Sequence, residues 1–198
     1  MVLPNQLTVL RIILTPIFLW LFLSDNLTMN LLAVLVFFIA ALTDWYDGWL
    51  ARKYNYITDW GKFLDPLADK ILTSTAFFGF VAVGKLDLWM VLIIVFRDFF
   101  ITGVRIYAEI KELDFKTSYI AKAKTFIQMA FLYFLLLLYF LEKVNSGGLL
   151  KKILLVLDNQ TLIYWSMLAI TLLTLYTLID YFIHNRNLFQ LTRKNETE

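Results

Sequence analysis

Two pairs of aspartates are the residues of this sequence best suited to chemistry. Asp44 and Asp47 are three residues apart, and Asp65 and Asp69 are four apart. On helices these spacings place both members of a pair on one face. Four clustered carboxylates repel one another and need compensating positive charge, and hard divalent cations such as Mg²⁺ or Mn²⁺ prefer all-oxygen ligands. The pattern therefore predicts a site for two metal ions of the kind that serves phosphoryl transfer.

Small residues accompany both pairs. Gly48 and Ala51 extend the face of the first pair, and Gly61 lies one turn before Asp65. Small side chains let helices approach closely or let a flat ligand lie against the backbone. Two alternatives stand beside this interpretation. The aspartates could simply cap helices at a membrane surface, or they could mark an ion pathway in a divalent-cation transporter. Their gathering at one end of two consecutive segments favours a catalytic site.

The elements that must position these residues are long apolar segments. Of the 198 residues, 60% are hydrophobic and 17% are charged, whereas a soluble domain has about half and about a quarter. A helix needs about 20 apolar residues to cross a membrane. We expect an all-α polytopic membrane protein with about six transmembrane helices in one bundle. The expected spans are Leu7–Leu23, Asn30–Leu50, Lys62–Val83, Leu88–Ala108, Ile120–Leu141 and Leu162–Ile183.

We expect one transmembrane catalytic domain over residues 1–185 and a polar C-terminal tail over 186–198. The first span lacks a basic leading region and a small-residue cleavage site, so it is expected to be retained as a helix. The chain has no cysteine and a single histidine, His184, beyond the last span. Disulfides and thiolate chemistry are therefore excluded, and the position of His184 argues against a histidine-based metal site or triad. Nothing in the sequence indicates nucleic-acid binding.

The distribution of basic residues predicts the orientation. Six spans put both termini on one side, together with the connections after spans two and four. That side carries Arg52, Lys53, Lys62, Arg105, Lys111, Lys116, Lys122, Lys124, Arg186, Arg193 and Lys194. The opposite side carries Lys85, Lys143, Lys151 and Lys152. Because basic residues collect on the cytoplasmic side, both termini and the active site are expected there, in the cell (inner or plasma) membrane.

The order of the motif residues carries a family resemblance. The sequence reads D-x-x-D-G-x-x-A-R from Asp44, then eight residues, then G-x-x-x-D-x-x-x-D from Gly61. This resembles the signature of the CDP-alcohol phosphatidyltransferases at every defined position. The resemblance implies that Asp44, Asp47, Asp65 and Asp69 ligate the metals and that Asp69 is also the catalytic base. It implies a cytidine-nucleotide pocket lined by Gly48, Ala51, Arg52 and Gly61.

Further stretches resemble one branch of that family, the bacterial phosphatidylglycerophosphate synthases. They are the segments 3–11, 58–70, 97–105 and 121–128, together with Pro16. The resemblance implies CDP-diacylglycerol as donor, sn-glycerol 3-phosphate as acceptor, phosphatidylglycerol phosphate and CMP as products, and a homodimer. This sequence has Asp98, Thr102 and Ala121 where the branch more often has Glu, Ser and Gly. Cardiolipin synthases of the eukaryotic type share two of the motifs, so a different acceptor stays an alternative.

An acceptor with about two negative charges requires cations near the carboxylates. Three candidates for its phosphate, Arg105, Lys122 and Lys124, lie at or next to the ends of the fourth and fifth spans. A fourth candidate, Arg97, lies deeper, two turns before Arg105. The lysines could instead anchor a helix to anionic lipid head groups. Near the N-terminus, Asn5, Thr8 and Arg11 are candidates for binding the donor's pyrophosphate. Equally, Asn5 could cap the first helix and Arg11 could reach the membrane interface.

Overall fold

The computed structural model describes residues 3–54, 59–111, 118–144, 154 and 156–185, and their regular secondary structure is entirely helical. The long helices are α1 (Leu3–Phe22), α2 (Leu27–Tyr54), α3 (Asp59–Ala82), α4 (Leu88–Ile110), α5 (Tyr119–Val144) and α7 (Gln160–His184). Each predicted span coincides with one of them to within four residues at either end. The all-α prediction is confirmed for this part of the chain.

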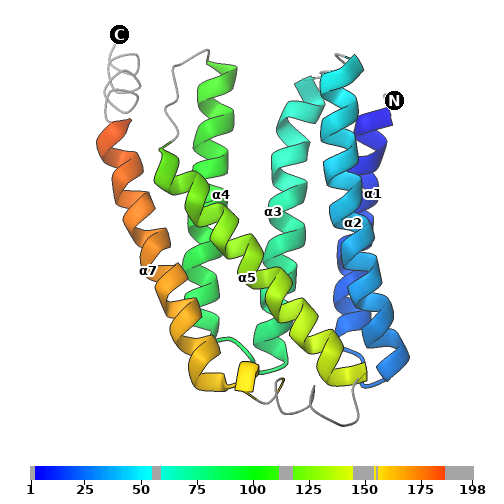
Figure 1. The fold of residues 1–198 in the computed structure, drawn as a ribbon. Coiled ribbons are helices and arrows are strands. Elements are labelled where there is room, and N and C mark those ends of the chain that lie inside the picture. The colour runs from blue at the N-terminus through cyan, green and yellow to red at the C-terminus, as the bar shows by residue number, and fades with distance from the viewer. Residues whose placement is uncertain (1–2, 55–58, 112–117, 145–153, 155, 186–198) are drawn as a thin grey trace.

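The chain reverses direction after each long helix (Figure 1). The starts of α1, α3 and α5 and the ends of α2, α4 and α7 therefore lie together, and we call this the site end. Helix α1 packs against α2 and α3, α3 packs against α4, and α4 packs against α7. Helix α5 crosses the bundle obliquely and contacts α7, α3 and α2. Residues from α1, α3, α4 and α5 can thus lie close together at the site end.

Aromatic side chains fill the core between α1, α2, α3 and α5. The ring of Phe22 lies 4.6 Å from that of Tyr139 and 5.2 Å from that of Phe80, measured between centroids. Gly79 allows this approach, because a Cβ atom at its position would lie 3.0 Å from the Phe22 ring. Buried Asn30 donates to the carbonyls of Leu21, Phe22 and Ser24, which gives hydrogen-bond partners to carbonyls at and just after the C-terminal end of α1.

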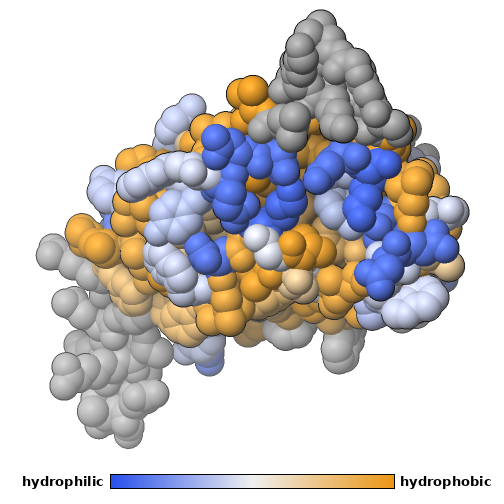
Figure 2. Space-filling model, turned by 90° about the horizontal axis from the view of Figure 1, so that it is seen from below, coloured by the Kyte–Doolittle hydropathy of each residue, from blue (hydrophilic) through white to orange (hydrophobic). Residues whose placement is uncertain are grey.

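At the end of the bundle opposite the site, one lysine forms ion pairs with two carboxylates from other parts of the chain. Lys85, in the turn between α3 and α4, pairs with Asp158 at 2.5 Å and with Glu142 at 3.3 Å. Gly84 makes the turn possible with φ of +73°. Burial lowers the pKa of Lys85, but its hydrogen bond to Asp158 and the two carboxylate charges outweigh burial and raise that pKa overall. Figure 2 shows hydrophilic surface gathered at this end, with hydrophobic surface around it.

Large apolar side chains cover much of the bundle's outer wall. Trp20, Phe96 and Ile179 are each more than half exposed, at 68%, 68% and 61%. Two helices, Tyr119–Val144 and Gln160–His184, are long and apolar enough to cross a membrane. Shorter apolar stretches lie at Gln6–Phe22 and Leu27–Thr43. The outer wall is thus apolar along several helices, and two of them meet the length and composition of a span.

Candidate active site

Asp65 and Asp69 lie one turn apart on α3, at the site end, and both are partly buried. The hydroxyl of Thr8, on α1, donates a hydrogen bond to Asp65 Oδ1. Asp69 Oδ2 lies 3.2 Å from the Nζ atom of Lys70. The predicted pairing of the two aspartates on one helix face is confirmed, because both positions are helical at a spacing of four residues.

Pro66 lies inside α3 between the two aspartates. Proline has no N–H, so the carbonyl oxygen of Lys62, four residues earlier, lacks its usual helical donor. The helix nevertheless continues on both sides of the proline, from Asp59 to Ala82. The missing bond therefore lies in the turn before Asp65, and the bond from the Asp69 N–H to the Asp65 carbonyl is retained.

The other half of the motif is helical in its backbone. Helix α2 runs through the motif segment 44–52 as far as Tyr54, and it packs against α3. Both halves of the motif therefore end at the site end, as predicted. The side chains of Asp44, Asp47, Arg52 and Ala51, and the surroundings of Gly48 and Gly61, lie outside the described residues. Among the side chains that are described, no three acidic or histidine groups converge as a metal site.

The three N-terminal candidates differ in what the structure describes. The side chain of Asn5 lies outside the described residues, although its backbone belongs to α1. Thr8 and Arg11 are fully buried, with 0% of each residue exposed. The contact from Thr8 to Asp65 gives this threonine a position beside the acidic face of α3. The proposed binding of pyrophosphate by these three residues stays a prediction.

A cavity of 510 Å³ opens between α3, α4 and α5 at the site end. Four cationic side chains from the three helices line it: Lys70, Arg97, Arg105 and Lys122. Arg97 is buried, whereas Arg105 and Lys122 are exposed. One carboxylate, Asp98, also lines the cavity. Because cations outnumber carboxylates on its wall, the cavity is suited to an anion, and a phosphate accepts bidentate bonds from arginine.

Asp98 is the centre of a buried polar cluster beside this cavity. Its Oδ1 atom accepts from Lys124 Nζ at 2.6 Å and from Arg97 Nη1 at 3.1 Å. Its Oδ2 atom accepts from Gln128 Nε2 at 3.0 Å. Lys124 is completely buried and is not among the residues that line the cavity. The charge of Lys124 is thus paired directly with Asp98, behind the wall formed by Arg97.

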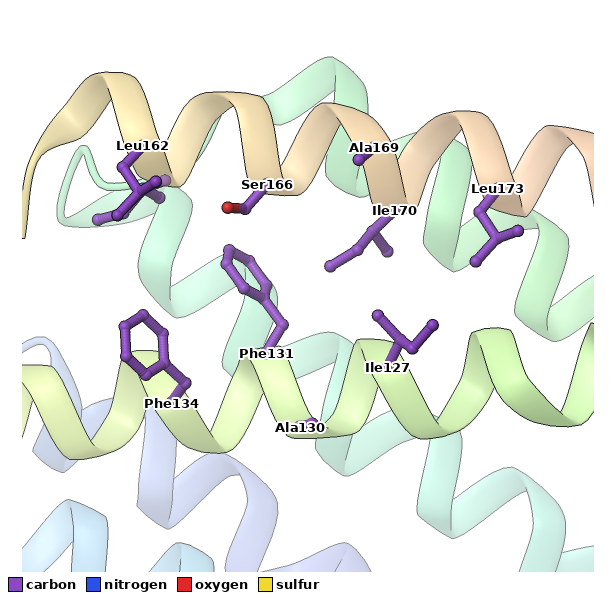
Figure 3. A pocket seen from close by; sticks show the side chains of 10 residues that line it. Ile127, Ala130, Phe131, Phe134, Leu162, Ser166, Ala169, Ile170 and Leu173 are labelled. Carbon is purple, nitrogen blue, oxygen red and sulfur yellow. The ribbon is translucent and has the colours of Figure 1, made fainter. Parts of the chain in front are cut away.

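A second cavity, of 530 Å³, lies between α5 and α7 and is apolar (Figure 3). Phe131, Phe134 and Ile127 on α5 face residues such as Leu162 and Leu173 on α7. Ser166 adds one hydroxyl, and none of the described side chains on this wall carries a charge. The chemistry of the molecule is therefore concentrated at the site end and not in this cavity.

Lys70, Asp98 and Gln128 were not among the site residues predicted from the sequence. Lys70 directly follows Asp69, and this position next to the motif is a signal that could have identified it. Gln128 follows Lys124 by four residues, which places both on one face of α5. The remaining link, from α5 to Asp98 on α4, joins residues 26 and 30 positions apart and has no local sequence signal.

Known proteins resemble this chain over most of its length. The sequence profile described as CDP-alcohol phosphatidyltransferase matches residues 1–174. A CDP-diacylglycerol–glycerol-3-phosphate 3-phosphatidyltransferase of Rickettsia typhi is 34% identical over 175 residues, which cover 88% of this chain and 93% of the relative.

Relatives of the same name occur in other bacteria. That of Blochmanniella floridana is 35% identical over 171 residues, covering 83% of this chain and 86% of its own length. That of Bacillus subtilis is 41% identical over 116 residues, covering 52% and 60%. The profile match covers most of the chain and includes both aspartate pairs. The chain therefore belongs to the CDP-alcohol phosphatidyltransferase family.

Proposed function

We propose that this chain transfers the phosphatidyl group of CDP-diacylglycerol to sn-glycerol 3-phosphate, giving phosphatidylglycerol phosphate and CMP. The observation that carries the proposal is the position of Lys70. Its Nζ atom lies 3.2 Å from Asp69, and the same side chain lines the cationic cavity. The acidic face of α3 and an anion-binding cavity are therefore joined by a single side chain. The names of the curated relatives supply the two substrates.

The cavity supplies what the acceptor needs. Arg97, Arg105 and Lys122 bind the phosphate of glycerol 3-phosphate, arginine as a planar fork and lysine as a point charge. Lys124 is paired with Asp98 behind the cavity wall and does not line the cavity. With the phosphate in the cavity, the hydroxyl end of the short acceptor extends past Lys70 toward Asp69. This arrangement favours a small phosphorylated alcohol over an uncharged one.

Asp69 then acts as the base. It takes the proton from the acceptor hydroxyl, and the hydroxyl oxygen forms a bond to the phosphorus that carries diacylglycerol. The bond between that phosphorus and the bridging oxygen of CMP breaks, and CMP leaves with the electron pair. Asn5, Thr8, Arg11, Gly48, Ala51, Arg52 and Gly61 form the proposed donor pocket.

Two divalent ions, Mg²⁺ or Mn²⁺, are proposed as cofactors. The partly buried carboxylates of Asp65 and Asp69 offer oxygen donors on one face, and Thr8 orients the first of them, so this donor set fits a hard cation. Asp44 and Asp47 would complete the set from α2. When bound, the ions supply positive charge that stabilises the diphosphate oxygens and the leaving CMP.

We further propose that all six long helices span the cell membrane as one domain over residues 1–185, with a polar tail over 186–198. The apolar outer wall and the gathering of the helix ends at the site end support this arrangement. The excess of basic residues on that side supports a cytoplasmic position for both termini and the active site. A homodimer is proposed on the family resemblance.

An acceptor panel tests the function most directly. The purified protein is supplied with CDP-diacylglycerol and Mg²⁺, and CMP release is measured with glycerol 3-phosphate, phosphatidylglycerol or glycerol as the acceptor. We expect rapid release with glycerol 3-phosphate and loss of activity after chelation. A clear preference for phosphatidylglycerol would assign the chain to the cardiolipin synthases instead. Metal flux into proteoliposomes without nucleotide would support a transporter.

A further inference from the structure

The proposed reaction leaves one buried charged group without a role. Only 5% of Asp98 is exposed, and its two carboxylate oxygens accept hydrogen bonds from Arg97, Lys124 and Gln128. A buried carboxylate is costly unless donors compensate for the lost water. Three donors from two helices meet that requirement here. The cluster therefore connects α4 to α5 through side-chain hydrogen bonds, at the wall of the cationic cavity.

The bond from Arg97 to Asp98 determines which guanidinium nitrogens are left for a ligand. Asp98 binds the guanidinium through Nη1 at 3.1 Å. The same side chain lines the cationic cavity. Because guanidinium is a rigid planar fork, holding one nitrogen constrains the direction of the others. A phosphate in the cavity is an acceptor whose geometry matches the guanidinium.

We infer that Asp98 is the positioning residue of the acceptor site, which holds Arg97 in place so that the cavity binds a phosphate monoester. The inference rests on the proposed transfer to glycerol 3-phosphate. Asp98 acts through Arg97 and does not itself bind the phosphate.

Asp98→Asn is the principal test, with purified enzyme and separate titrations of both substrates. Asparagine keeps the shape but loses the charge that fixes Arg97. Since a hydrogen bond to a charged group contributes about 1.5–3 kcal/mol, the KM for glycerol 3-phosphate should rise about tenfold or more. The KM for CDP-diacylglycerol and kcat should change little, because only acceptor binding is weakened. Asp98→Glu should return the KM toward the wild-type value.

A double variant separates positioning from net charge and from folding. Asp98→Asn leaves Arg97 and Lys124 facing each other, and that repulsion could unfold the protein. Adding Lys124→Gln removes one charge of each sign, so the Tm should recover. If Asp98 positions Arg97, the KM for glycerol 3-phosphate stays high in the double variant. Asp158→Asn is the matched control, since it breaks a carboxylate–lysine pair at the opposite end. Its KM values should equal those of wild type.

Two results would overturn the inference. One is a wild-type KM for glycerol 3-phosphate in Asp98→Asn or in the double variant. The other is a parallel loss of kcat and of affinity for both substrates that follows the Tm, which is the mark of a structural role alone. Failure of the wild-type enzyme to release CMP with glycerol 3-phosphate would be a different result. It would refute the proposed function and this inference with it.

Discussion

The hydrogen bond from Thr8 to Asp65 gives the sharpest test of the metal site. Thr8→Val replaces the hydroxyl with a methyl group of similar size, so packing on α1 is preserved. Thr8 is fully buried, whereas Asp65 is partly exposed. Water can therefore replace part of the lost bond at the carboxylate. The loss should fall near the lower limit of the 1.5–3 kcal/mol range for a hydrogen bond to a charged group, or about tenfold in metal affinity.

Thermal unfolding of the purified protein across a range of Mn²⁺ concentrations measures this loss without an activity assay. A ligand stabilises the folded state in proportion to the logarithm of its concentration over Kd. If Kd is tenfold weaker, about tenfold more Mn²⁺ is needed to reach the same Tm. At saturating metal this corresponds to about 1.4 kcal/mol less stabilisation of the folded state. Thr8→Ser, which keeps the hydroxyl, should behave as wild type.

Thr15 offers a matched control on the same helix. It is also buried, but its hydroxyl donates to the Arg11 carbonyl at 2.8 Å and not to a carboxylate. Thr15→Val should lower Tm by the same amount with and without metal. The reasoning is refuted if the Mn²⁺ curves of Thr8→Val and wild type coincide, or if Thr15→Val shifts the curve equally.

Three further predictions concern the base, the acceptor cavity and the opposite end. Asp69→Asn should reduce CMP release by about 10²–10⁴-fold with an unchanged circular dichroism spectrum, and retained turnover would exclude Asp69 as the base. Arg105→Ala should raise the KM for glycerol 3-phosphate far more than that for CDP-diacylglycerol in steady-state kinetics, and an equal rise in both would contradict its assignment. Lys85 has a raised pKa in the folded state, so its pairs with Glu142 and Asp158 contribute full stability below about pH 10.4, which is lost as pH rises further. Thermal unfolding between about pH 9 and 11 should show a loss that Lys85→Met does not show, and identical slopes would count against the pairing.

The hydrophobic segments of the sequence predicted which parts of the chain are helical more accurately than they predicted where each helix begins and ends. Helix α2 continues to Tyr54, four residues beyond the predicted limit at Leu50, although the added turn contains Arg52 and Lys53. Apolar content reports where a segment is buried or meets lipid. Backbone hydrogen bonding instead continues until a breaker or a turn interrupts it, whatever the polarity of the side chains. For the same reason, α1 and α3 begin at Leu3 and Asp59, before the predicted starts at Leu7 and Lys62.

The site was predictable where its residues are neighbours in sequence. The spacing of Asp65 and Asp69 was enough to place them on one face of α3. The charge of Lys124 suggested a phosphate contact, but packing pairs it with Asp98, from a helix that the sequence alone could not place beside it. The bond between Thr8 and Asp65 joins positions 57 residues apart. A single sequence gives helix faces but not the partners that those faces meet.

The proline between Asp65 and Asp69 leaves the spacing of the two carboxylates intact. Pro66 donates no hydrogen bond to the carbonyl of Lys62, so the missing bond lies in the turn before Asp65. The N–H of Asp69 is still placed to donate to the Asp65 carbonyl, four residues earlier. Thr8 holds the first carboxylate against α1, and Lys70 lies beside the second at the cationic cavity. A bend of α3 at the proline would therefore move both carboxylates together and keep them one turn apart.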